Sequence, residues 1–173
     1  WAGRQVGMNG RINELTACVA YFGLQDLGSR NAERRRIALD LWNALRDHLW
    51  EHDAPRIIPL DRARIANHAL YVYPFRVHRD VNRAAYVARL NAAGLTATEG
   101  YLIPPLHDYP AFRHFQVGPL PIVEELSGRT LVLLPDLQPG YATPMSEVAR
   151  ILVEALDGTP SLRLDPEGDV TWV

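Results

Sequence analysis

The chain has 173 residues, of which 47% are hydrophobic and 22% charged, so it is long enough to form one soluble domain with a buried core. Its formal net charge of −2 gives no strong attraction to nucleic acid or to an anionic membrane. No apolar run approaches the length of a transmembrane helix. We therefore expect neither a nucleic-acid partner nor a membrane anchor.

The termini and the single cysteine give further expectations. The chain starts at Trp1, without an initiator methionine or a signal-peptide pattern, as a fragment or a trimmed product would. A single cysteine, Cys18, excludes an internal disulfide, and its position within the first predicted helix favours a buried small side chain. A chain without disulfides fits a reducing compartment, and we expect a cytoplasmic protein.

Residues 7–27 combine a polar, glycine-broken entry with a helix. The apolar positions of that helix follow the i, i+3, i+4 spacing of a buried face: Ile12, Leu15, Val19 and Phe22. Asn9 precedes the helix, where free backbone N–H groups and the helix dipole favour an anion. The alternative is that Asn9 only caps the backbone locally.

A second, long amphipathic helix is predicted over residues 31–52, after a stop and restart at Gly28 and Ser29. His48 and His52 stand four residues apart in this helix, but no third ligand has suitable spacing. We therefore predict no metal site.

The middle of the chain predicts a strand, a helix and a second strand. Aromatic and β-branched residues over 68–77 indicate the first strand, with an edge or a bulge at Pro74. Asp80 is the expected N-cap of the helix, Gly94 its end, and residues 95–99 the short second strand.

Residues 100–115 differ in kind, because three prolines exclude a long regular element and six aromatic or imidazole side chains crowd the segment. Such a loop suits the wall of a ligand site, and it equally suits a proline-rich cover over the core. His107 and Asp108 are adjacent, but neighbours in sequence need not face each other, so no acid–base couple is assumed.

The last third predicts a short helix at 121–126, a buried strand at 129–134 and a helix at 145–156 capped by Thr143. Together the elements predict an α+β fold in which helices cover a small, largely antiparallel sheet. We divide the chain into a contact segment with the first helix (1–30), a small domain (31–158) and a tail with a hairpin (159–173).

Several motifs, in order and with consistent spacing, resemble the C-terminal part of the DegT/DnrJ/EryC1/StrS aminotransferases, a family of sugar aminotransferases of fold type I that use pyridoxal phosphate. The resemblance extends to about Leu156. The matching pieces are Gly7–Ile12 with Glu14, Asn31–Arg35 with Ala38, His68–Tyr73 with Arg76 and Val77, Gly94–Leu95, Tyr101, Pro105–His107 and Leu131–Pro135.

This resemblance implies roles for five residues. The position of Asn9 implies an amide that reaches across the dimer to the cofactor phosphate of the partner subunit. Arg11 would lie near the substrate end of the same site, and an amide and a guanidinium are both good donors to phosphate oxygens. Tyr101 and His107 would lie near the bound nucleotide sugar, with His68 close to the same wall.

The large cofactor-binding domain that the family uses is not part of this sequence. All 18 basic residues are arginine, so no lysine is present to form the covalent link to pyridoxal phosphate. We therefore expect no catalytic residue here. The chain alone should be an inactive C-terminal portion of a homodimeric enzyme that acts on a keto-sugar nucleotide or a related cyclic ketone. The alternative is a non-catalytic module for dimerisation or nucleotide-sugar binding.

Overall fold

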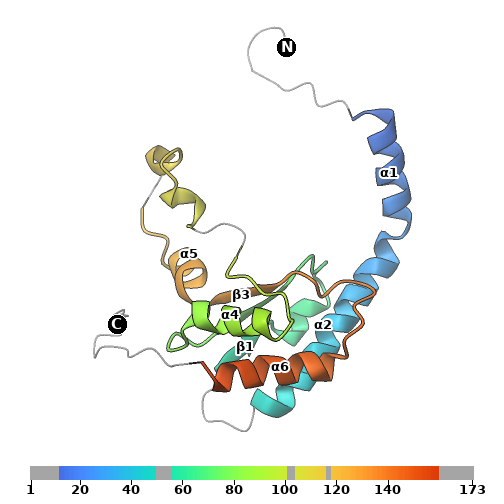
Figure 1. Cartoon of the computed structure of the whole chain (residues 1–173). Coiled ribbons are helices and arrows are strands. Elements are labelled where there is room, and N and C mark those ends of the chain that lie inside the picture. The colour runs from blue at the N-terminus through green and yellow to red at the C-terminus, as the bar shows by residue number, and fades with distance from the viewer. Residues whose placement is uncertain (1–11, 50–55, 101–103, 116–117, 160–173) are drawn as a thin grey trace.

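The computed structural model describes residues 12–49, 56–100, 104–115 and 118–159 (Figure 1). The predicted α+β class is confirmed: helices cover a small antiparallel sheet. The helices and strands are α1 (Glu14–Gln25), α2 (Leu27–Leu49), β1 (Ile57–Pro59), α3 (Arg62–Ile65), β2 (Tyr73–Val77), α4 (Arg83–Ala92), α5 (Pro121–Glu125), β3 (Leu131–Leu134) and α6 (Met145–Asp157). Short helical turns are η1 (Leu106–Asp108), η2 (Arg113–Phe115) and η3 (Leu126–Thr130).

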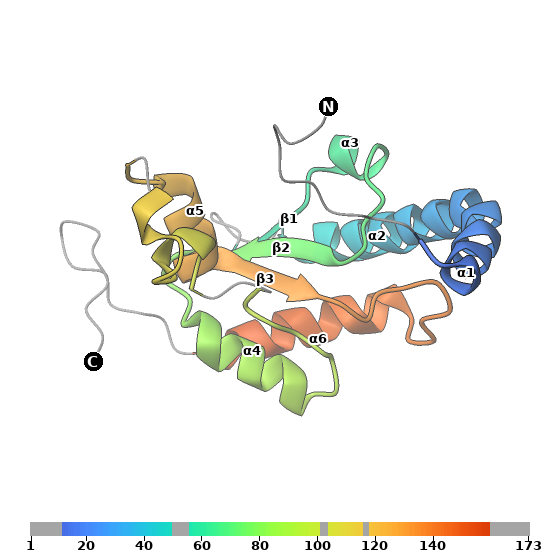
Figure 2. The same cartoon turned by 90° about the horizontal axis from the view of Figure 1, so that it is seen from above.

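The sheet has the order β1-β2-β3, and both pairs of strands are antiparallel (Figure 2). Alternate side chains of β2 point to one face, and Tyr73, Phe75 and Val77 on that face are all buried. These side chains belong to a single core cluster with buried residues of α2, α4 and α6. Burial of this cluster is the main source of the domain's stability.

Helix α2 fits the core because its apolar residues recur on one side, where Ile37, Leu41 and Leu45 are buried. It packs along α6, whose buried residues follow the same helical spacing. The amphipathic pattern of the second predicted helix is therefore confirmed, although α2 begins at Leu27, before the predicted restart at Gly28 and Ser29. The break between the first two helices lies at Asp26, the C-cap of α1.

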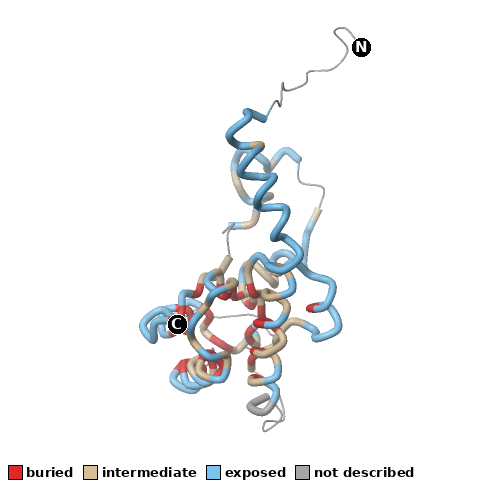
Figure 3. Tube along the Cα trace, turned by 90° about the vertical axis from the view of Figure 1, so that its right-hand side faces the viewer, coloured by how far each residue is buried: buried red, intermediate tan, exposed pale blue. Residues whose placement is uncertain are grey.

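The prediction that α1 has a buried face is wrong for this chain. Leu15, Val19 and Phe22 are 78%, 68% and 64% exposed, and Cys18, expected to be buried, is exposed as well. Helix α1 extends beyond the core, and its length is exposed apart from one partly buried residue (Figure 3). The periodicity identified an apolar face correctly, but nothing in the described part of the chain covers it.

The two strands predicted around α4 are shorter than expected. Strand β2 starts at Tyr73, and the preceding residues 68–72 are an irregular connection with a bend at 71–72, in which Leu70 has a left-handed φ of 47°. Residues 95–99 contribute a single bridge, Thr98 to Leu133. The reason is local, since the side chain of Asn91 occupies both the N–H and the C=O of Ala97.

Two predicted helix caps are also corrected. The carboxylate of Asp80 lies 2.7 Å from Nδ1 of His78, and Asn82 instead caps α4 by accepting from the N–H of Ala85. At α6 the cap is Pro144, without a side-chain bond, rather than Thr143. A short polar side chain can cap a helix only when no nearer partner uses it.

Within the described residues, no helix is both long and apolar enough to span a membrane. The hairpin predicted in the tail falls on residues 160–173, outside the described residues.

Candidate functional site

Of the five residues with an implied site role, the structure describes two. Asn9, Arg11 and Tyr101 lie outside the described residues. His68 is exposed in the connection that follows α3, and His107 lies in η1. The described residues show no hydrogen bond or ion pair between His68 and His107, so the structure does not join them into one constellation.

A polar network holds the connection that carries His68. Arg34 of α2 donates to the side chains of Asn31, at 2.9 Å, and Gln138, at 2.8 Å. The Gln138 amide in turn donates to the backbone carbonyl of Tyr71. Residues from three distant parts of the sequence thus fix this connection beside the N-terminal half of α2. The sequence placed Arg34 in the motif region Asn31–Arg35 but did not indicate its contact with Gln138, because the two residues lie 104 positions apart.

His107 lies in a long excursion between α4 and β3, and we call residues 104–126 the excursion segment. Its side chain is only 13% exposed, and Nε2 is 3.7 Å from an oxygen of Asp108, which is beyond hydrogen-bond distance. Further along, the rings of His114 and Phe115 lie 3.9 Å apart. The expectation of a proline-interrupted, aromatic loop is confirmed, and short helical turns organise it.

Arg83, the first residue of α4, joins the two ends of this excursion. Its side chain is almost fully buried, and Nη2 is 2.8 Å from a carboxylate oxygen of Glu99. Nη1 donates to the carbonyls of Leu126, at 3.3 Å, and Leu131, at 3.4 Å. Sequence reasoning missed Arg83, because its partners are 16, 43 and 48 positions away. A lone arginine at a helix start gives no signal of such contacts.

Large apolar side chains are exposed on both α1 and the excursion segment. On the excursion segment, Phe115 is 68% exposed and Ile122 75%. The two elements project from opposite ends of the core toward the same side, as Figures 1 and 2 show together. Exposed apolar surface of this kind is typical of an interaction site.

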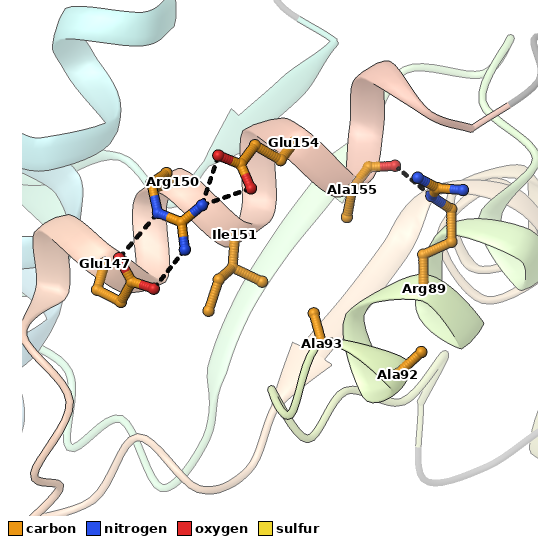
Figure 4. Close-up of a pocket in the computed structure, with 8 residues that line it drawn as sticks. All are labelled: Arg89, Ala92, Ala93, Glu147, Arg150, Ile151, Glu154 and Ala155. Atoms are coloured by element: carbon orange, nitrogen blue, oxygen red, sulfur yellow. Dashed lines mark hydrogen bonds and ion pairs between the residues drawn. The ribbon is translucent and has the colours of Figure 1, made fainter.

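A hollow in the surface lies elsewhere, between α4 and α6, with a volume of about 470 Å³ (Figure 4). Arg150 is held there by Glu147 at 2.5 Å and Glu154 at 2.5 Å, and the hydrogen bond from Arg150 lowers the pKa of Glu147. Arg150 is thus already paired with two carboxylates, and neither His68 nor His107 lines this groove, so the groove is a poor candidate for the site. In the part of the chain that the structure describes, no three metal-ligating side chains gather.

A family model described as the DegT/DnrJ/EryC1/StrS aminotransferase family matches residues 1–147. The chain belongs to this family. The match covers the segment with Asn9 and Arg11, the sheet, the excursion segment and the start of α6. A search of curated proteins gave no match.

Solved structures of family aminotransferases share the fold. DesV from S. venezuelae has a TM-score of 0.69 and 23% identity, over 95% of this chain and 41% of DesV. PseC from Helicobacter pylori has a TM-score of 0.66 and 18% identity, over 89% of this chain and 40% of PseC. NtdA from Bacillus subtilis, solved with bound cofactor PMP, has a TM-score of 0.68 and 18% identity, over 91% of this chain and 36% of NtdA.

The chain thus spans about two fifths of the length of these family members. The family's cofactor is pyridoxal phosphate or its amine form, but this sequence does not fit it unaided. The sequence has no lysine, so no side chain here provides the amine that holds the cofactor covalently.

Proposed function

We propose that this chain is the C-terminal domain of a pyridoxal-phosphate-dependent aminotransferase that acts on a keto-sugar nucleotide or a related cyclic ketone. The match of residues 1–147 to an aminotransferase family, in a sequence without lysine, carries this proposal. The complete enzyme would be a cytoplasmic homodimer. Its lysine-bearing domain would lie on the rest of the same polypeptide or on a second one.

The exposed apolar surface of α1 supports the proposal that a separate cofactor-binding domain completes the enzyme. An isolated helix with a 12-residue span is marginal in water, and apolar residues on its surface gain nothing unless they are covered. We infer that residues 1–30 form the contact segment, that the small domain extends over 31–158 and that the cofactor domain packs on α1. Residues 159–173 would form a tail that follows the small domain.

The roles of this chain's residues follow from their chemistry. Asn9 would donate an amide N–H to the cofactor phosphate across the dimer, and Arg11 would bind the anionic end of the substrate. Tyr101, His107 and His68 would contact the nucleotide sugar. The bound cofactor supplies the electron sink for amino-group transfer. Proton transfer at the substrate would belong to the lysine that this chain lacks.

Incubation of the chain alone with pyridoxal phosphate, followed by borohydride reduction and mass spectrometry, tests the predicted dependence on another polypeptide. We expect no adduct on any side chain. A stable adduct at a side chain within this sequence would contradict the proposal.

The second candidate, a non-catalytic nucleotide-sugar module, draws support from the excursion segment and its exposed aromatic residues. Calorimetric titration with UDP-glucose and dTDP-glucose separates the two. Tight binding by the isolated chain favours the module. Binding that appears only when a lysine-bearing polypeptide is added favours the shared active site.

A further inference from the structure

We propose that Arg83 is a positioning residue that clamps both ends of the excursion segment and so sets the location of the wall that carries His107. That the wall with His107 faces substrate rests on the proposed function. That Arg83 clamps the segment rests on the contacts of Arg83 alone.

The first observation is where the partners of Arg83 lie. Glu99 comes shortly before the excursion segment. Leu126 is the last residue of that segment and begins η3, and Leu131 begins β3 shortly after it. One guanidinium therefore links the backbone that leads into the excursion segment to the backbone that leads out of it. A planar group with several fixed donors can satisfy a carboxylate and two carbonyls at once, which the single ammonium of lysine cannot do with the same geometry.

The second observation is the depth of the contact. The Arg83 side chain is 7% exposed, so it is shielded from water and its bonds are stronger than those of a surface pair. By contrast, Arg79, on the segment before α4, reaches Glu125 at 3.8 Å and is 45% exposed. The buried arginine is thus the stronger of these two links between the α4 region and the end of the excursion.

The third observation is that the backbone beyond the clamp is already paired. Thr98 exchanges two hydrogen bonds with Leu133, of 3.0 and 2.8 Å, and β3 pairs with β2 from Leu131 onward, so the sheet already fixes the chain up to Thr98 and from Leu131. Beyond these paired residues Arg83 contacts Glu99 on one side and Leu126 on the other. Loss of its side chain should therefore loosen the segment that follows without loosening the sheet.

Hydrogen–deuterium exchange of the full chain tests this clamp, comparing wild type with Arg83→Met, Arg83→Lys and Arg150→Met. The matched control, Arg150, is also paired with two carboxylates, but it is exposed and both partners are on its own helix. We expect amides of residues 104–126 to exchange about tenfold faster in Arg83→Met, because charge-assisted hydrogen bonds contribute that order to a local opening equilibrium. In Arg83→Lys the exchange rate of these amides should lie between the rates in Arg83→Met and wild type. In Arg150→Met it should equal the wild-type rate.

The pattern across the molecule decides the interpretation. Unchanged exchange of residues 104–126 in Arg83→Met would overturn the clamp. Equal acceleration of α2 and α6 would also overturn it, since Arg83 would then be a residue of global stability. Glu99→Gln keeps the contacts of Arg83 with the two carbonyls and removes one charge. It should also speed the exchange of residues 104–126, by a smaller factor, and it provides the test if Arg83→Met does not fold.

Histidine-selective NMR gives a readout at the proposed wall itself. In Arg83→Met the His107 and His114 resonances should shift, whereas the His68 resonance should stay. An unmoved His107 signal, or an equal shift of His68, would overturn the positioning role. Both measurements use the isolated chain without cofactor, so the clamp stands or falls separately from the aminotransferase proposal.

Discussion

The phenol of Tyr86 in α4 donates a 3.0 Å hydrogen bond to the backbone carbonyl of Leu152 in α6. The same ring meets Phe75 of β2 edge-to-face, with ring centroids 6.4 Å apart. One buried side chain thus connects two helices and the sheet. The small domain is built around this junction.

The two buried tyrosines of the core should respond oppositely to loss of the hydroxyl. Tyr86→Phe should lower the free energy of unfolding by about 1 kcal/mol, because the Leu152 carbonyl loses its donor. Tyr73→Phe should be neutral or stabilising, since its hydroxyl is buried without a partner in the described part of the chain. Urea denaturation of both variants measures this difference, and a larger loss for Tyr73→Phe would contradict it.

Alkaline pH should destabilise the domain through the same residues. Burial raises the pKa of both Tyr73 and Tyr86 above the ordinary tyrosine value of about 10. A raised pKa in the folded state means that the stabilising contribution is complete below pH ~10 and falls as pH rises toward the folded pKa. The free energy of unfolding should therefore be lower at pH 11 than at pH 8. Phenolate absorbance from these two rings should appear only with unfolding, and early ionisation of all seven tyrosines would refute this.

Apolar substitutions in α1 should leave the stability of the isolated chain nearly unchanged. Leu15→Ala combined with Phe22→Ala removes side chains that are mostly in water, so the melting temperature should hardly change. Leu41→Ala is the control, because Leu41 is fully buried in α2 and its truncation should cost about 2–5 kcal/mol. Calorimetry compares the variants, and a loss in the double variant equal to that of Leu41→Ala would show that α1 packs on this domain.

The end of α4 should be sensitive to a single methyl group. Gly94 has a left-handed φ of 84°, so Gly94→Ala should cost about 1 kcal/mol through backbone strain although the space around it is open. Gly23→Ala in α1 is the matched control, because Gly23 is helical and equally open, and alanine is favoured in helices. Thermal denaturation that ranks Gly94→Ala as no worse than Gly23→Ala would contradict this.

Local signals in the sequence predicted the elements that pack on each other within this domain. Helix α6 matches its predicted span to one residue, because apolar spacing, a proline before it and Gly158 after it all agree. The signals failed where a distant partner decides the outcome. Residues 68–72 looked like strand by composition, but the irregular connection there is held by Gln138, from far along the chain.

The candidate site was predictable only in part, for a similar reason. Motif order indicated the family, but the contacts that organise the excursion segment come from Arg83, whose partners no local pattern reveals. The exposed face of α1 shows a second limit of prediction from sequence. Periodicity reports that a face is apolar, and it does not report which polypeptide covers that face.

The proposed division between a lysine-bearing domain and this chain is tested most directly by tagging the chain in its own cells, purifying it under native conditions and treating it with borohydride. We expect pyridoxal phosphate to be recovered on a lysine outside these 173 residues, in material that transfers an amino group to a keto-sugar nucleotide, and we expect Asn9→Ala to weaken cofactor retention. Recovery of the chain with no lysine-bearing polypeptide and no pyridoxal phosphate would contradict the proposal.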